Sequence, residues 1–193
     1  MGDQPLLRPP SALAPILERS GALGFTMASE PRTGALLRAL AASKPAGRFL
    51  ELGTGTGVAT SSLLDGMDSA SRLISVDVDE QVQAVARDAF PHDSRLSLVT
   101  GDALAFLGRQ EPASFDLVFA DAMPGKYEGL ADALRVVRIG GFYVIDDMLP
   151  QPNWPADHPP KVSALLAQLA ALDGFQLAPL RWASGVVIAV RMA

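Results

Sequence analysis

The segment from Glu51 to Gly57, which reads ELGTGTG, constrains the fold more than any other part of the chain. It follows the apolar stretch Arg48–Leu52, which predicts a β-strand, and leads into a stretch typical of a helix over about 57–65. Glycines permit a tight turn and let a ligand approach the backbone closely. The N-terminus of the helix then offers free N–H groups and a positive dipole end. We therefore expect a cofactor above this turn; the alternative is a glycine turn that only packs the helix on the strand.

Strand and helix patterns alternate along the rest of the chain. Further strands are expected at Arg72–Asp77, Arg95–Thr100, Phe115–Asp121 and Phe142–Asp146. Helices are expected at about 11–20, 30–43, 79–89, 103–109, 127–137 and 161–172, with Gly140 and Gly141 ending the fifth of these. Such alternation predicts a doubly wound α/β fold, in which helices cover both faces of a mostly parallel sheet. Near the C-terminus, Phe175–Leu180 and Gly185–Val190 are separated by four residues and predict a hairpin, so one of these strands runs antiparallel.

Length and composition narrow the class of protein. The 193 residues suffice for one domain, which we divide into an N-terminal helical segment over 1–44 and an α/β core over 45–193. A net charge of -5 without a basic run argues against binding to nucleic-acid phosphates, and no apolar run approaches the ~20 residues that span a bilayer. The chain has no cysteine, which excludes disulfides and thiolate metal sites and fits the cytoplasm. Small molecules and metal cations are the expected partners.

Acidic residues stand at the ends of four consecutive predicted strands. Asp77 lies 20 residues after Gly57, where an acid can hydrogen-bond ribose hydroxyls. Three further positions follow the next strands: Asp102, Asp121, and the pair Asp146 and Asp147. Ligands of open α/β sheets bind beyond the carboxyl ends of the strands, so these acids are candidate ligand contacts. Taken singly, each acid also fits a helix N-cap or a solvated loop.

Three motifs together resemble the class I S-adenosylmethionine-dependent methyltransferases. They are ELGTGTG, ISVDVD over 74–79 and TGDA over 100–103, and the C-terminal hairpin matches the last two strands of that family. The resemblance covers about residues 25–191 and implies a Rossmann-like, seven-stranded sheet in the order 3-2-1-4-5-7-6, with strand 7 antiparallel. It also implies contacts to the cofactor from Glu51, Gly53, Thr54, Gly55, Gly57, Asp77, Val78, Gly101, Asp102, Ala103 and Asp121. Met27, Ala28 and Ser29 align with a family segment that touches the cofactor.

Two other functions stay open on the sequence. An NAD(P)-dependent oxidoreductase uses a Gly-x-Gly-x-x-Gly fingerprint, which would require a third glycine at the position of Val58. A non-catalytic protein that binds S-adenosylmethionine would retain the fold and lack the acceptor site. The C-terminal hairpin and the position of Gly57 favour the methyltransferase over the oxidoreductase.

Two further stretches are similar to metal-dependent O-methyltransferases of the catechol and caffeoyl-coenzyme-A type. These are FDLVFADAMPGKYE over 115–128 and GGFYVIDDML over 140–149. The resemblance implies a small hydroxylated acceptor and a Mg²⁺ ion, or another divalent cation, held by Asp121, Asp146 and Asp147. Oxygen ligands of this kind suit such cations. A metal-bound hydroxyl loses its proton more easily, and Lys126 would take the proton or steer the anion.

The chain departs from that narrower pattern at two positions. The family's lysine follows the strand-four acid by three residues, whereas Lys126 follows Asp121 by five. Asp147 stands where the family has asparagine, and its extra charge either strengthens a divalent site or accompanies the loss of the metal. A solvated lysine at a helix start is the alternative for Lys126, and a loop acid pair is the alternative for Asp146 and Asp147. The apolar composition and the family together imply a homodimer.

Overall fold

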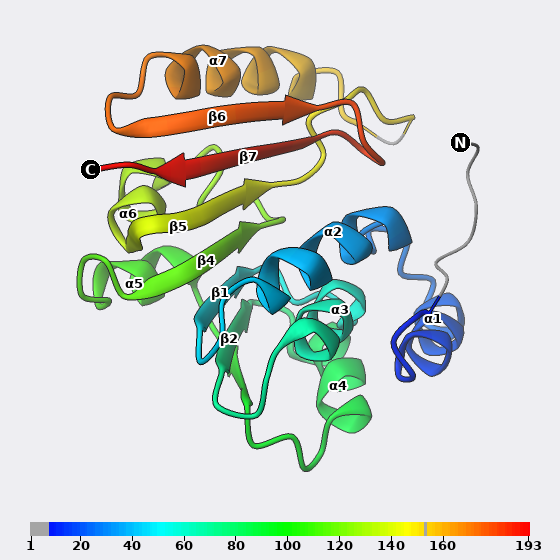
Figure 1. Ribbon diagram of the computed structural model, residues 1–193. Coiled ribbons are helices and arrows are strands. Elements are labelled where there is room, and N and C mark those ends of the chain that lie inside the picture. Colours follow the sequence, from blue (N-terminus) through cyan, green and yellow to red (C-terminus); the bar gives the residue numbers. More distant parts are fainter. Residues whose placement is uncertain (1–7, 153) are drawn as a thin grey trace.

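A seven-stranded sheet forms the centre of the computed structural model, which describes residues 8–152 and 154–193 (Figure 1). The strands are β1 (Arg48–Leu52), β2 (Arg72–Asp77), β3 (Leu96–Thr100), β4 (Phe115–Ala120), β5 (Val137–Ile145), β6 (Phe175–Leu180) and β7 (Val186–Arg191). Their order is 3-2-1-4-5-7-6, and β7 runs antiparallel to both β5 and β6. The predicted fold class, strand order and hairpin are therefore confirmed. Residues 1–7 of the expected N-terminal segment lie outside the described residues.

Helices cover both faces of the sheet. They are α1 (Leu13–Ala22), α2 (Pro31–Ala42), α3 (Val58–Gly66), α4 (Glu80–Ala89), α5 (Ala103–Gly108), α6 (Leu130–Arg135) and α7 (His158–Ala170). Apolar residues of α2 and α3 pack on one face, and those of α5, α6 and α7 pack on the other. A third cluster joins α1 to α3 and α4, beside the sheet (Figure 1). None of the described helices combines the length and apolar character needed to cross a membrane.

The register of the parallel strands brings their ends to one level. Leu52 of β1 pairs with Val76 of β2 and with Ala120 of β4, and Ala120 in turn pairs with Ile145 of β5. The residue after each of these positions is Gly53, Asp77, Asp121 or Asp146. The glycine turn and three of the acids thus meet at the same edge of the sheet, where ligands of this fold class bind.

The region between β4 and β7 corrects one prediction. The sequence pattern places Gly140 and Gly141 at the end of a helix over about 127–137, but they lie inside β5, and α6 covers only Leu130–Arg135. Between the pairs Phe115↔Val137 and Leu117↔Phe142, β5 carries more residues than β4, so the strand bulges. Gly140 has a φ of +73°, and a Cβ on Gly141 would lie 2.8 Å from the carbonyl oxygen of Arg138. The positive φ of Gly140 and the close approach at Gly141 favour glycine in this β-bulge.

Candidate active site

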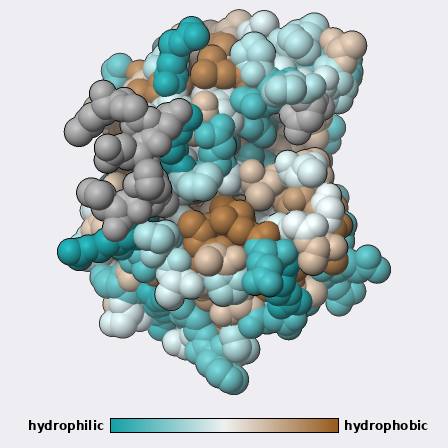
Figure 2. All heavy atoms as spheres, turned by 90° about the vertical axis from the view of Figure 1, so that its right-hand side faces the viewer, coloured by the Kyte–Doolittle hydropathy of each residue, from teal (hydrophilic) through white to brown (hydrophobic). Residues whose placement is uncertain are grey.

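A cavity of about 390 Å³ opens at the carboxyl ends of β1, β2 and β4. Figure 2 looks onto this side of the molecule, and hydrophobic side chains gather near its centre. The lining residues come from the segment before α2, the glycine turn and the strand ends: Phe25, Met27, Ala28, Ser29, Gly53, Thr54, Gly55, Thr56, Val58, Ala59, Val76, Asp77, Val78, Asp79, Val82, Gly101, Ala103, Asp121, Ala122 and Pro124. A volume of this size falls in the range of small-molecule sites, ~300–1,000 Å³.

The glycine turn between β1 and α3 has a backbone conformation that favours glycine at three of its positions. Gly53, Gly55 and Gly57 have φ values of +97°, +52° and +95°, in the region that favours glycine. A Cβ on Gly53 would lie 2.8 Å from the backbone oxygen of Asp121, and one on Gly57 would lie 2.7 Å from the Cβ of Ala86. Gly57 does not line the cavity, so the alternative of a turn that only packs the helix on the strand accounts for this glycine. That alternative does not account for the cavity above Gly53 and Gly55.

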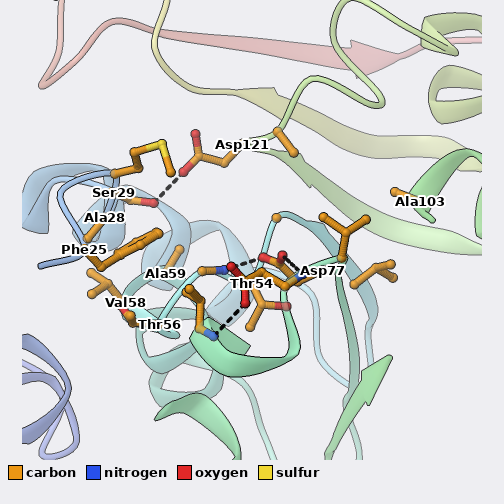
Figure 3. A pocket seen from close by; sticks show the side chains of 18 of the residues that line it. Phe25, Ala28, Ser29, Thr54, Thr56, Val58, Ala59, Asp77, Ala103 and Asp121 are labelled. Atoms are coloured by element: carbon orange, nitrogen blue, oxygen red, sulfur yellow. Dashed lines mark hydrogen bonds between the residues drawn. The ribbon is translucent and has the colours of Figure 1, made fainter. Parts of the chain in front are cut away.

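Asp77 faces the glycine turn across the cavity floor (Figure 3). Its Oδ2 accepts the N–H of Gly55 at 2.7 Å, and its Oδ1 accepts the N–H of Asp79 at 2.9 Å. A carboxylate offers about four acceptor positions, so two further donors can still be accepted. Asp77 is therefore held in place by the backbone and keeps capacity for a ligand with two hydroxyls.

Gly101 and Ala103 line the cavity beyond Asp77, whereas Asp102 between them does not. The carboxylate of Asp102 accepts the N–H of Leu104 at 2.8 Å and caps α5. Gly101 and Ala103 thus face the cavity. The side chain of Asp102 is a helix N-cap, which is the alternative that the sequence left open.

Glu51 lies beneath the glycine turn and does not reach the cavity. The side chain is fully buried, and its Oε2 accepts the hydroxyls of Thr60 and Ser75. Its Oε1 has no partner among the described residues. Burial without a cation raises the pKa of Glu51 to about 8, so the carboxyl is protonated at neutral pH. The expected contact of Glu51 with a ligand would therefore pass through the turn above it.

Asp121 forms the opposite wall of the cavity from Asp77 (Figure 3). The hydroxyl of Ser29 donates to its Oδ2 at 2.7 Å, and the ammonium of Lys126 lies 3.8 Å from its Oδ1. Burial raises the pKa of Asp121 to about 7, against the opposing effect of Lys126. Both oxygens are thus oriented by the chain, one from the N-terminal segment and one from the loop after β4.

Lys126 is buried, with 5% of its side chain exposed, and is absent from the residues that line the cavity. Its ammonium donates to the backbone oxygen of Asp146 at 2.9 Å. The residue precedes α6 by several positions, because the helix begins only at Leu130. The alternative of a solvated lysine at a helix start is therefore wrong.

The carboxylates of Asp146 and Asp147 are arranged differently from each other. Asp146 is buried, and its Oδ1 accepts the hydroxyl of Ser184 and the N–H of Asp147. Asp147 is half-buried and has a φ of +58°, a conformation that few non-glycine residues adopt. Within residues 8–152 and 154–193, no group of three or more acidic or histidine side chains is arranged to hold a metal ion.

The segment before α2 contributes more to the cavity than the sequence indicates. Met27, Ala28 and Ser29 line it as their alignment implies, but Phe25 also does, and a Cβ on Gly55 would lie 3.2 Å from its ring. No glycine pattern or charge marks Phe25. The one feature of the sequence that could indicate Phe25 is its position, as an aromatic residue just ahead of the segment that aligns with the family.

Comparison with known proteins adds sequence and structural relatives. Residues 50–148, just over half of the chain, match the family described as a methyltransferase domain. A probable O-methyltransferase of Mycobacterium tuberculosis is 37% identical over 138 residues, which cover 69% of this chain and 61% of that protein. The chain spans between 54% and 61% of the length of the curated relatives that it matches first.

Two solved structures share the fold over nearly the whole chain. Cofactor-bound Rv0187 from MTB superposes with a TM-score of 0.85 and 24% identity, covering 99% of both chains. The O-methyltransferase TomG from Streptomyces achromogenes gives a TM-score of 0.83 and 23% identity, covering 97% of this chain and 92% of its own. The family match spans β1, the glycine turn and the acids through Asp147, which are the elements that build the cavity. The chain belongs to the methyltransferase domain family.

Proposed function

We propose that this chain transfers a methyl group from S-adenosylmethionine to an oxygen of a small hydroxylated acceptor. The observation that carries the proposal is the cavity with the glycine turn and Asp77 at one end and Asp121 at the other. The relatives support it, since the mycobacterial protein is named a probable O-methyltransferase and TomG was solved with S-adenosylmethionine.

The residues at the first end fit this cofactor. The positive φ values of Gly53 and Gly55 keep side chains out of the cavity floor, so an elongated ligand can lie against the backbone. Asp77 retains acceptor capacity for a pair of ribose hydroxyls. Val78 and Ala103 supply apolar walls beyond Asp77, where a flat ring would pack.

Bound S-adenosylmethionine would supply a methyl group on a positively charged sulfur. The chain then has to hold an acceptor oxygen in line with that methyl, since positioning accounts for much of such a rate enhancement. Asp121 and Ser29 form a fixed polar pair at the wall where the acceptor would approach. Apolar side chains including Phe25 and Met27 line the same cavity and limit the access of water.

A divalent metal does not fit the acids of this edge as they are arranged. The implied ligands were Asp121, Asp146 and Asp147, but the ammonium of Lys126 lies 3.8 Å from the carboxylate of Asp121 and 2.9 Å from the backbone oxygen of Asp146. The Oδ1 of Asp146 already accepts two donors from the chain. We therefore route no step of the reaction through a metal ion.

Binding of S-adenosylhomocysteine, measured by calorimetry, tests the cofactor part of the proposal. Asp77→Ala should weaken binding by about 2 kcal/mol, or roughly thirtyfold, because hydrogen bonds to a charged group are lost. Asp88→Ala is the matched control, because it removes an exposed acid of α4 that pairs with Arg19. No affinity for S-adenosylhomocysteine, or tighter binding of a nicotinamide dinucleotide, would contradict the proposal.

Transfer of labelled methyl groups to a panel of hydroxylated small molecules tests the acceptor part. Incorporation into a phenolic or other hydroxyl oxygen is the expected result. Tight cofactor binding without transfer to any member of the panel would instead favour the non-catalytic binding protein.

A further inference from the structure

We propose that Lys126 is a built-in cation that takes the place of a divalent metal between the ends of β4 and β5. This inference rests on the proposed methyl transfer, because it names the positive charge that stabilises the acids at the acceptor end of the cavity. It concerns a positioning residue, since Lys126 acts through Asp121 and Asp146.

The first support is where the ammonium lies. Asp121 and Asp146 follow strands that pair directly, with Ala120 opposite Ile145. The Nζ of Lys126 is 2.9 Å from the backbone oxygen of Asp146 and 3.8 Å from the Oδ1 of Asp121. It therefore bridges the same two strand ends that a metal ion held by these acids would have to bridge.

The second support is the loop that places the ammonium there. Gly125 has a φ of +87°, and a Cβ on it would lie 2.5 Å from the side chain of Leu52. The hydroxyl of Tyr143 donates to the backbone oxygen of Gly125, and the N–H of Gly125 donates to Glu128 at 2.7 Å. The backbone next to Lys126 is thus fixed against β1 and β5, which makes the position of the ammonium a feature of the fold.

The third support is that one oxygen of each of these two carboxylates already accepts hydrogen bonds. The Oδ2 of Asp121 accepts from Ser29 at 2.7 Å, and the Oδ1 of Asp146 accepts from Ser184 and from the N–H of Asp147. A divalent cation that bound to these two oxygens would have to displace those donors. It would also meet the positive charge of Lys126 at contact distance, and like charges repel most strongly where water is excluded.

The consequence is that Lys126 and Ser29 have separate roles in holding Asp121 at the acceptor end. Lys126 balances buried negative charge and, together with Ser29, holds the Asp121 carboxylate by both oxygens. The orientation of Asp121 toward the cavity would then be independent of the supply of metal ions.

Binding of Mn²⁺ to the full chain, followed by electron paramagnetic resonance, tests the proposal. The wild-type protein should take up no Mn²⁺ at millimolar concentration, with or without S-adenosylhomocysteine. Lys126→Gln removes the charge and keeps an N–H donor for Asp146, so it should raise Mn²⁺ affinity by about tenfold or more. Lys126→Arg should restore the exclusion, because it restores the charge. Lys161→Met is the matched control, because it removes a partly exposed lysine of α7 that pairs with Asp157.

Two results would overturn the proposal. One is Mn²⁺ uptake by the wild-type protein that Asp121→Asn abolishes. The other is the absence of uptake by both wild type and a folded Lys126→Gln variant, which would show that Lys126 does not exclude the metal. Should Lys126→Gln not fold, Lys126→Met, which also removes the charge, takes its place in the same titration, and the same two results decide. Failure to bind S-adenosylhomocysteine would instead contradict the proposed function, and calorimetry measures that binding separately.

Discussion

At the β1–β2 end of the cavity the carboxylate of Asp77 accepts from backbone N–H groups, whereas at the β4–β5 end the carboxylates of Asp121 and Asp146 have side-chain partners. Asp77 is held by two N–H groups and keeps acceptor capacity. Asp121, Lys126 and Asp146 form a group in which Ser29 and Ser184 supply further donors. The first end is built to accept hydrogen bonds from a ligand, and the second is built to hold its own charges in place.

The buried acids at the two ends also differ in their partners, and this difference gives the largest predicted effect on stability. Glu51, beneath the β1–β2 end, is buried with hydroxyls and no cation, and its pKa rises from 4.5 to about 8. At a pH between these two pKa values, the carboxyl of Glu51 is ionised in the unfolded chain and protonated in the folded chain, so the free energy of unfolding falls as pH rises. The slope approaches 1.4 kcal/mol per pH unit, which gives about 3 kcal/mol between about pH 5.5 and 7.5.

Glu51→Gln should remove that part of the pH dependence. Denaturant unfolding at several pH values would show a flatter profile for the variant than for the wild type. A smaller slope should remain, because the raised pKa of Asp121, about 7, acts in the same direction. Glu80→Gln, at an exposed first-turn position of α4, is the control. Parallel profiles for wild type and Glu51→Gln would show that Glu51 is ionised in the fold.

The two ends meet at Gly53, and a substitution there should disturb both. Gly53→Ala adds a Cβ 2.8 Å from the backbone oxygen of Asp121 at a φ of +97°. Strain and the clash should cost about 2 kcal/mol of unfolding free energy and weaken binding of S-adenosylhomocysteine by about tenfold or more. Thermal unfolding and calorimetry measure the two effects.

Gly140→Ala separates the strain from the clash. Gly140 also has a positive φ, +73°, but no atom lies within 4 Å of the point where a Cβ would stand. Its substitution should cost about 1 kcal/mol and leave cofactor binding unchanged. Equal effects of the two substitutions would show that the close approach of the turn to Asp121 is not important.

Local patterns in the sequence predict the β1–β2 end well. The turn, the helix that follows and the acid at the end of β2 are all set by residues close in sequence, and backbone geometry dictates the glycines. The strand order follows from the family resemblance and from the short hairpin, which permits only an antiparallel return.

The β4–β5 end could not be predicted in the same way because its contacts join distant residues. Lys126 bonds a residue 20 positions away, and Ser184 bonds one 38 positions away. The spacing between Asp121 and Lys126 carries no information about the direction of a long side chain. The bulge in β5 also changes how its residues match β4, so the local pattern of the glycines there indicates the end of a helix instead.

Ser184 tests how far the β4–β5 end depends on its own hydrogen bonds. Ser184→Ala removes the hydroxyl that donates to the buried carboxylate of Asp146, whose pKa burial already raises. The loss should cost about 1.5 kcal/mol of unfolding free energy at neutral pH, because a buried acceptor is left with fewer partners. Ser163→Ala, on the exposed face of α7, should change stability little in the same denaturant titration. A Ser184→Ala variant as stable as wild type would argue that Asp146 is held by Lys126 and Asp147 alone.

Within the β4–β5 end, Ser29 should give the smallest effect, because its partner keeps a second contact. Ser29→Ala removes the donor to Oδ2 of Asp121 and leaves Lys126 near Oδ1. We expect a loss of about 1 kcal/mol in unfolding free energy and a further rise in the pKa of Asp121, since a hydrogen bond that favours the charged form is gone. Ser43→Ala, which removes an exposed hydroxyl at the end of α2, is the control. If Ser29→Ala cost as much as Ser184→Ala, the N-terminal segment would hold Asp121 as firmly as the β6–β7 turn holds Asp146, and the β4–β5 end would extend across the cavity to the segment before α2.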